Sequence, residues 1–221
     1  MEPVHVTGVE VSVRMVIVTG LCAMLPAACA GNSPVFDKAQ LRFFVTSRPA
    51  GNGGGHLGGL DGADAHCQAL AKAVGSTRQW HAYLSATRPD GSAIHARDRI
   101  GKGPWVNANG KVVANSLQEL HGSPGPPEDA LAYHEDGKRV GLRHDILTGS
   151  NPDGTLASGD FTCRNWTSTA GKTWLGHSNR IGSCCGDRST SWNSAHESQG
   201  CSSGALAAMG GASYFCCFAA N

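Results

Sequence analysis

Short stretches rich in aromatic, β-branched or alternating apolar residues predict β-strands in the first half of the chain. Residues 41–47 predict the first strand, and residues 79–85, where apolar and polar positions alternate, predict a second. Residues 106–113 place an Asn109-Gly110 turn between two β-prone runs, which is typical of a hairpin.

Apolar residues recur at helical spacing over residues 61–74, which predicts the main α-helix. Asp61 stands at the expected N-cap, Asp64 suits the positive N-terminal end, and Gly75 provides the stop. A shorter helix is expected over residues 116–120. The face of the main helix that we expect to be buried consists of Ala63, Cys67, Leu70 and Val74.

The C-terminal tail, residues 191–218, combines a tryptophan-bearing loop with an aromatic strand that ends in Cys216 and Cys217. Cysteines in a C-terminal strand need partners far back in the sequence, for which Cys67 and Cys163 are candidates. The chain contains 30 glycines without a repeat, which indicates long ordered loops. We therefore expect an α+β domain with two helices, short antiparallel strands and long irregular loops, closed by disulfides.

The N-terminal segment has the pattern of an export signal. An apolar core over residues 15–25 follows Arg14, and small residues precede Cys29, as in a bacterial lipoprotein signal, although Pro26 replaces the usual aliphatic residue. We expect a signal peptide over 1–29 with lipidation at Cys29, a tether over 30–39 and one domain over 40–221. The protein would then be exported and anchored to a membrane, in the periplasm or at the cell surface, or otherwise secreted.

Charge and cysteine content narrow the classes of partner. The net charge is +1, only 16% of the residues are charged, and the basic residues form no run, so no nucleic-acid partner is expected. Contact with a membrane is expected only through the lipid anchor. Seven cysteines follow Cys29, and in an oxidising compartment they are candidates for disulfides before metal ligands or nucleophiles.

Several segments, in this order, resemble the endostatin-like domains, which are C-terminal non-collagenous modules of some collagens with a C-type-lectin-like fold. The resemblance covers nearly all of the expected domain. It is carried by the following stretches: Gly62-Ala-Asp-Ala-His-Cys-Gln68, Trp80-His-Ala-Tyr-Leu-Ser85, Ala96-Arg-Asp-Arg99, Gly149-Ser-Asn-Pro-Asp-Gly154, Cys163 near Trp166, Cys201 and the cysteine-bearing last strand.

This resemblance implies a nested pair of disulfides, Cys67 with Cys217 and Cys163 with Cys201. Three cysteines are extra to that pattern. Because adjacent cysteines rarely bridge each other without strain, we expect Cys216 to pair with Cys185 or with its neighbour Cys184.

The resemblance does not extend to a zinc site. Some endostatins bind zinc through N-terminal and first-strand histidines plus an aspartate, but Arg42 occupies the strand position here and only Asp98 matches. No metal site is therefore expected. Arg97 and Arg99 flank Asp98, and we interpret them as a solvated or ion-paired surface rather than a heparin-binding cluster.

The candidate ligand loop lies in the second half of the chain, between residues 151 and 196. Sugar-binding C-type lectins bind calcium through a Pro-containing loop and a Trp-Asn-Asp run, and calcium needs about six to eight oxygens. Asn151-Pro152-Asp153 could be such a loop, but Asn151–Gly154 is also an ordinary turn, and Ser194 replaces the expected carboxylate. The candidate ligand residues are Asn151, Asp153, Trp192, Asn193 and His196.

No catalytic motif of the G-x-S-x-G or H-E-x-x-H type occurs. A zinc site or a Cys185–His196 thiol pair remains an alternative, with these possible zinc ligands: His177, Cys184, Cys185, His196 and Cys201. The function predicted from the sequence is a non-catalytic extracellular or envelope module that binds a glycan or a protein without a cofactor. A calcium-dependent lectin is the second hypothesis, and a zinc- or thiol-dependent hydrolase is the third.

Overall fold

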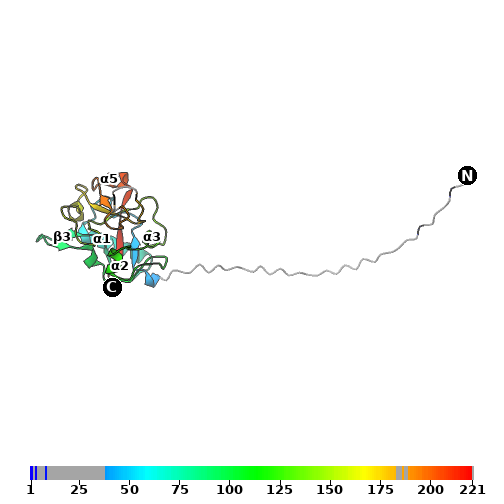
Figure 1. The fold of residues 1–221 in the computed structure, drawn as a ribbon, viewed down its shortest axis with the longest axis horizontal. Coiled ribbons are helices and arrows are strands. Elements are labelled where there is room, and N and C mark those ends of the chain that lie inside the picture. The colour runs from blue at the N-terminus through cyan, green and yellow to red at the C-terminus, as the bar shows by residue number, and fades with distance from the viewer. Residues whose placement is uncertain (2, 4–7, 9–37, 183–185, 187–188, 221) are drawn as a thin grey trace. The chain divides into compact units, whose positions relative to one another are not determined.

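The fold is described from a computed structural model in which residues 1, 3, 8, 38–182, 186 and 189–220 are placed (Figure 1). Apart from positions 1, 3 and 8, the predicted signal peptide with its lipidation residue Cys29 therefore lies outside the described residues. The neighbouring cysteines Cys184 and Cys185 also lie outside them. Residues Phe36–Asn221 belong to one compact unit. None of the described helices is long and apolar enough to cross a membrane.

The described part of the chain is a mixed α/β domain (Figure 1). Its helices are η1 (Lys38–Gln40), α1 (Gly59–Ala73), η2 (Ala96–Arg99), α2 (Leu117–His121), α3 (Glu128–Leu131), α4 (Cys163–Trp166) and α5 (Ser203–Ala208), of which η1 and η2 are 3-10 helices. Its main sheet contains β1 (Phe43–Val45), β2 (Trp80–Ala82), β7 (Asp145–Leu147), β8 (Trp174–His177), β9 (His196–Glu197) and β10 (Gly211–Ala219). Two small sheets pair β3 (Ala86–Thr87) with β4 (Ala93–Ile94) and β5 (Trp105–Val106) with β6 (Val112–Ala114).

Strand β10 is the centre of the main sheet, whose order is β1-β10-β7-β8-β9, with β2 also pairing with β10. It runs antiparallel to β1 and β2 and parallel to β7, with Phe215 opposite Leu147. The expectation of antiparallel strands was therefore wrong for the pairing of β7 with β10. The chain between these two strands is long enough for a crossover, which a parallel pair requires.

Alternate residues of the central strands enter two different hydrophobic clusters. In β10, Phe215 and Cys217 belong to the cluster that includes the buried face of α1, whereas Cys216 and Phe218 belong to the cluster that includes Leu120 of α2. Successive side chains of a strand point to opposite faces, so this alternation places the two clusters on the two faces of the sheet.

Helix α1 forms where the apolar spacing predicts it and buries Ala63, Cys67 and Leu70. It begins at Gly59, however, and its N-cap is Gly58 rather than Asp61. Gly58 and Gly59 have φ values of 80° and 73°, a left-handed conformation that glycine adopts readily. The backbone conformation of Gly58 and Gly59 therefore starts the helix two residues before Asp61, the residue expected to cap it with its side chain.

The second helix and the hairpin occur where the sequence predicts them. Ser116 caps α2 by accepting a hydrogen bond from the backbone N–H of Glu119, at 3.2 Å. The hairpin pairs β5 with β6, and Gly110 closes its turn with a φ of 76°. Helices α3, α4 and α5 were not predicted, because each is only four to six residues long and carries little periodicity.

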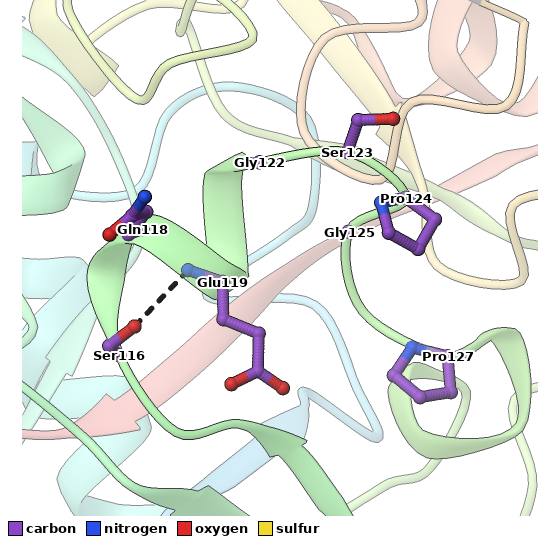
Figure 2. Close-up of a pocket in the computed structure, with 8 residues that line it drawn as sticks. All are labelled: Ser116, Gln118, Glu119, Gly122, Ser123, Pro124, Gly125 and Pro127. Atoms are coloured by element: carbon purple, nitrogen blue, oxygen red, sulfur yellow. Dashed lines mark hydrogen bonds between the residues drawn. The ribbon is translucent and has the colours of Figure 1, made fainter.

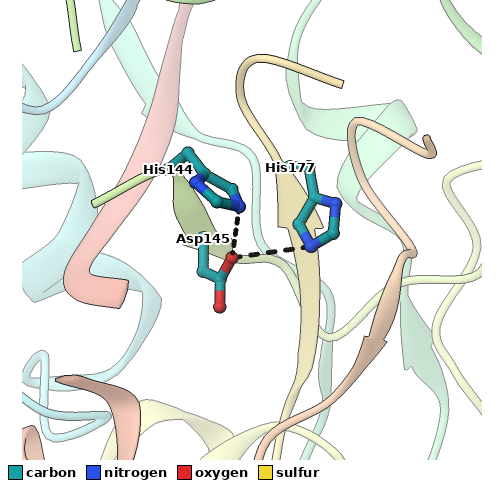
Figure 3. Close-up of side chains that lie close together, drawn as sticks. All are labelled: His144, Asp145 and His177. Atoms are coloured by element: carbon teal, nitrogen blue, oxygen red, sulfur yellow. Dashed lines mark ion pairs between the residues drawn. The ribbon is translucent and has the colours of Figure 1, made fainter. Parts of the chain in front are cut away.

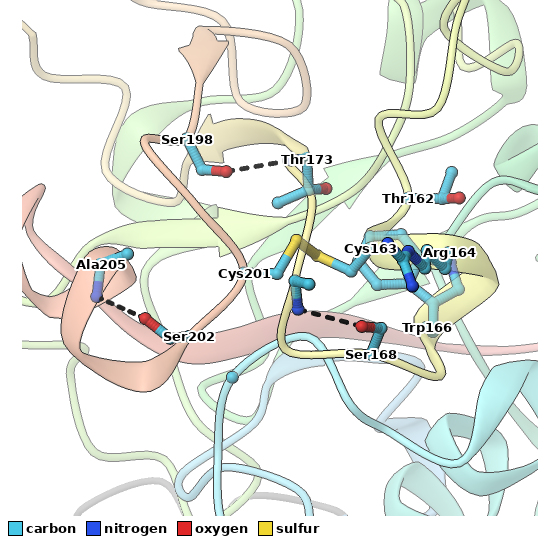
Figure 4. The surroundings of a disulfide bond; sticks show 12 residues. Thr162, Cys163, Arg164, Trp166, Ser168, Thr173, Ser198, Cys201, Ser202 and Ala205 are labelled. Carbon is cyan, nitrogen blue, oxygen red and sulfur yellow. Dashed lines mark hydrogen bonds between the residues drawn. A yellow bond between two sulfur atoms is a disulfide. The ribbon is translucent and has the colours of Figure 1, made fainter.

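Both disulfides implied by the resemblance are present in the structure, between Cys67 and Cys217 and between Cys163 and Cys201. The first joins α1 to β10 across 150 residues. The second lies in a crowded region of the domain (Figure 4), where a Cβ added at Gly55 would be 2.3 Å from the Cys163 sulfur. The packing against this bond therefore requires a glycine.

Short α4 is not an ordinary helix, because its four residues all have positive φ values between 51° and 65°. Such a left-handed turn costs about 1–2 kcal/mol per residue when no glycine is present. Several contacts hold it, including the Cys163 disulfide, the Trp166 indole N–H that donates to the Ser85 carbonyl at 2.8 Å, and the Asn165 amide oxygen that accepts from the Thr87 N–H.

The expected bond between Cys216 and Cys185, or Cys184, was wrong, because Cys216 is a free thiol in the structure. The reason is the alternation of β10. Cys217 faces α1 and its partner Cys67, whereas Cys216 faces the opposite cluster, where it packs with aromatic and aliphatic side chains and is 1% exposed.

Cys216 is expected to resist alkylation in the native protein. Burial raises the pKa of its thiol well above the usual value, so neither access nor thiolate is available to iodoacetamide. Peptide mass mapping should show labelling at Cys216 only when denaturant is added before the reagent. Rapid labelling without denaturant would contradict the buried position.

Candidate functional site

Two open depressions lie side by side around α2. The larger, of about 630 Å³, is formed by the start of α2 and the Pro/Gly-rich loop that follows it (Figure 2). The second, of about 520 Å³, shares Gln118 and Gly122 with the first and extends to Arg97 and Asp153. A third, of about 110 Å³, lies between the same loop and the segment around Trp192.

These depressions form one surface from chain segments that are far apart in the sequence. We call the residues that line them the α2 surface: Arg97, Asp98, Ser116–Gly125, Pro127, Pro152, Asp153, Arg180 and Thr190–Asn193. The Pro/Gly-rich loop after α2 supplies part of its wall.

The sequence suggested that Trp192 could contact a ligand, but its ring is buried in the structure. Its side chain is 4% exposed, and its indole N–H donates to the carbonyl of Leu120 at 2.9 Å. The ring packs against Tyr83 with the ring centroids 4.7 Å apart. Trp192 therefore forms the floor of the α2 surface and ties the C-terminal loop to α2.

Asn193 is also buried and links three elements through hydrogen bonds. Its side-chain N–H groups donate to the Tyr83 hydroxyl at 2.9 Å and to the Asn151 and Pro152 carbonyls at 3.1 Å. Tyr83 in turn lies 2.7 Å from His121 Nε2. Because His121 Nδ1 faces the Leu117 carbonyl at 2.9 Å and must donate to it, Nε2 accepts from Tyr83. Burial lowers the pKa of His121 and raises that of Tyr83, so this chain of hydrogen bonds remains uncharged.

The Asn151–Gly154 segment is a turn, as its residue types predict, with the Gly154 N–H donating to the Asn151 carbonyl at 2.9 Å. Asp153 is exposed, and its Oδ1 accepts hydrogen bonds from the backbone and hydroxyl of Thr155. The Asn151 and Pro152 carbonyls, which could be calcium ligands at this turn, already accept hydrogen bonds from Asn193. Few oxygens remain here for an ion that needs about six to eight.

The arginines beside Asp98 are engaged in ion pairs. Arg97 lies 3.8 Å from Asp98 and 3.5 Å from Asp153, whereas Arg99 lies 2.7 Å from Asp64 on α1. This arrangement agrees with the interpretation of an ion-paired surface. Among the described residues, the α2 surface therefore has no group of unpaired arginines that would bind a polyanion.

A second cluster, which the sequence analysis missed, lies on three neighbouring strands of the main sheet. Asp145 begins β7 and lies directly opposite His177 at the end of β8, while His196 begins β9. His144 immediately precedes β7. The Nε2 atoms of His144 and His177 lie 3.3 and 3.5 Å from Asp145 Oδ1 (Figure 3), and His196 Nε2 lies 3.7 Å from Oδ2.

Every histidine of this cluster has its Nδ1 atom at a backbone carbonyl. The distances are 3.1 Å from His144 to Leu142, 2.6 Å from His177 to Ser189 and 3.0 Å from His196 to Glu197. A carbonyl only accepts, so each Nδ1 carries the proton. In the neutral rings, each Nε2 therefore presents a lone pair.

The carboxylate of Asp145 is buried and poorly satisfied. Its side chain is 1% exposed, and neither oxygen accepts a hydrogen bond from any described residue. Burial raises the pKa of Asp145 and lowers that of His177 to about 4. Both shifts show that this region disfavours isolated charges.

The structure thus brings together two of the zinc ligands considered from the sequence, whereas Cys201 is used in a disulfide and Cys184 and Cys185 lie outside the described residues. His177 Nε2 and His196 Nε2 are 3.0 Å apart, whereas Cys201 is bonded to Cys163. No short motif marks the cluster, because its members come from three segments and meet only through strand pairing. The adjacent His144-Asp145 pair at the start of a β-prone run was the available signal.

Comparison with known proteins gives partial support for the resemblance seen in the sequence. No family model matches the chain. The chain is 32% identical over 124 residues to the human collagen alpha-1(XVIII) chain, a match that covers 52% of this chain and 7% of that protein. Similarity to a collagen chain fits an endostatin-like domain and suggests an extracellular, non-catalytic role. The two disulfides add to the indication that the protein is exported.

Proposed function

We propose that this chain is an exported ligand-binding module with the C-type-lectin-like fold of the endostatin-like domains, and that its ligand binds at the α2 surface. The observation that carries the proposal is the convergence of segments from four parts of the chain on this surface. Its irregular loops are held by the Ser116 cap, the Trp192 indole and the Asn193 hydrogen bonds, so little entropy is lost on binding.

The lining of the α2 surface favours an uncharged carbohydrate. It offers hydroxyl, amide and proline side chains, and its arginines are already engaged. Arg97 pairs with two carboxylates, and Arg180 donates to the carbonyls of Pro126 at 2.7 Å and Thr190 at 3.1 Å. A sulfated polymer would bind to cationic groups without other partners, and these two arginines already have partners within the protein.

Binding of the full chain to an array of neutral and sulfated glycans would test this function. We expect binding to a neutral glycan that persists at moderate salt and in the presence of a calcium chelator. If the chain bound only the sulfated glycans, and this binding were lost as the salt concentration rises, the attraction would be due to charge alone, which would contradict the proposal of a neutral glycan. Loss in chelator would favour the calcium-dependent lectin, and capture of a peptide ligand instead would contradict the glycan proposal.

Replacing Gln118 should locate the site. Gln118 is exposed and borders both larger depressions, so Gln118→Ala should weaken glycan binding by about tenfold through the loss of a side-chain hydrogen bond. The matched control is Gln199→Ala, an exposed glutamine near α5, at the opposite end of the domain from α2 in Figure 1. Equal effects of the two substitutions on the dissociation constant would place the ligand elsewhere.

A further inference from the structure

We infer that His144, Asp145, His177 and His196 form a zinc site, separate from the α2 surface. The first observation is chemical: these side chains present only acceptors to one another. Three Nε2 lone pairs and both carboxylate oxygens converge, and no described residue donates a hydrogen bond to either oxygen. Such a group of acceptors needs a cation at its centre.

The second observation is geometric. The ligand atoms of His144, Asp145 and His177 all lie within 4.8 Å of one another. Four ligands arranged tetrahedrally at about 2.0–2.1 Å from zinc are about 3.3–3.4 Å apart. The separations of 3.3 and 3.5 Å to Asp145 Oδ1, and of 3.0 Å between His177 and His196, are close to that spacing. His196 lies beside this group of three, with its Nε2 3.7 Å from Oδ2, and would become the fourth ligand through a small movement of its ring.

The third observation is the set of contacts behind the ligands. A zinc-bound histidine usually donates its other ring N–H to a carbonyl or carboxylate, which fixes the tautomer and the orientation of the ring. All three histidines already make this contact, with Leu142, Ser189 and Glu197. The backbone therefore holds three rings in the protonation state that metal binding requires.

The ligand set selects the metal. Three imidazole nitrogens and one carboxylate suit zinc, whereas calcium and magnesium prefer six or more oxygens. An ion can enter from the side of His144, whose side chain is 26% exposed while Asp145 and His177 are at 1% and 2%. With four protein ligands no position is left for a reacting water, so the site would be structural.

A zinc ion at this site would cross-link β7, β8 and the short edge strand β9. Strand β9 has only two residues, so its ladder contributes few hydrogen bonds. The site also differs from the zinc site that the resemblance suggested, since it uses neither the Arg42 position nor Asp98.

Zinc binding to the full chain, stripped with chelator and desalted, would test the inference. After incubation with zinc chloride and a second desalting step, elemental analysis should find one zinc per chain, and the thermal midpoint should rise, because the ion binds the native state. Cobalt(II) in place of zinc should give the visible absorption of a four-coordinate ion. No retained metal and no shift of the midpoint would overturn the inference.

Substitutions separate this site from adventitious binding. Asp145→Asn and His177→Gln should each weaken zinc binding by more than about a hundredfold. Substituting a residue that only supports a ligand typically costs less than that. His56→Gln, a matched change at an exposed histidine outside the cluster, should leave one zinc per chain. Equal retention in His177→Gln and His56→Gln would overturn the site.

Asp145→Asn and a further variant, His196→Gln, keep the test decisive if His177→Gln fails to fold. Asp145→Asn is isosteric and can donate to a neighbouring Nε2, so the metal-free protein should keep its thermal midpoint but lose the zinc response. A zinc response equal to that of the wild type would overturn the assignment of Asp145 as a ligand. Unchanged affinity in His196→Gln would overturn the assignment of the fourth ligand.

Discussion

Replacing Cys67 and Cys217 together by alanine is expected to lower the free energy of unfolding by about 5 kcal/mol. The bond closes a loop of 150 residues, and the loop-entropy relation assigns a value of about this size to so long a loop. Domains are stable by only about 5–15 kcal/mol, so the variant should be largely unfolded or melt far below the wild type. Urea unfolding followed by circular dichroism would measure the change.

Cys216→Ala is the matched control for this experiment, because it changes the adjacent position of the same strand. Cys216 is a buried free thiol, so its replacement leaves only a small cavity and should cost about 1 kcal/mol. A loss in the double variant no larger than that of the control would contradict the proposed importance of the long loop.

Asp64→Ala is expected to destabilise the domain by about 2–4 kcal/mol, because Asp64 joins α1 to β2 and η2. Its carboxylate accepts from the Ala82 N–H at 2.8 Å, lies 2.8 Å from His81 Nδ1 and pairs with Arg99 at 2.7 Å. The Arg99 side chain is only 12% exposed. Removing its partner leaves a largely buried charge uncompensated, which is costly.

Asp61→Ala provides the comparison within the same helix. Asp61 is exposed in the first turn of α1, where its charge interacts with the helix end by less than about 1 kcal/mol. The free energies of unfolding of the two variants, from urea titrations at the same pH, should therefore differ by more than about 1 kcal/mol. Similar values would show that Asp64 acts only as a charge near the helix terminus.

The sequence supports firm predictions where the structure is local. The spacing of Ala63, Cys67 and Leu70 predicts the buried face of α1, and Asn109-Gly110 predicts the hairpin. These features depend on neighbouring residues and backbone preferences, which are visible in a short window. The start of α1 was missed because it depends on two glycines in a left-handed conformation rather than on a side-chain cap.

The candidate sites depend on residues that the sequence keeps apart. The residue types of the Asn151–Gly154 turn predicted its conformation, but not that Asn193 would bond its carbonyls or that Trp192 would be buried beneath α2. The α2 surface could not be predicted, because it arises from loops that meet only after the sheet has formed. Its lining residues carry no common motif.

The sequence by itself determined the main helix, the hairpin, the aromatic C-terminal strand and the cysteines available for closure. Only the tertiary structure decided which face of β10 each cysteine occupies, and so why Cys217 reaches Cys67 while Cys216 remains a free thiol. The same pairing of strands assembled Asp145 with three histidines from separate segments. Side-chain direction in a strand alternates with every residue, so its consequences depend on the register and neighbours that folding supplies.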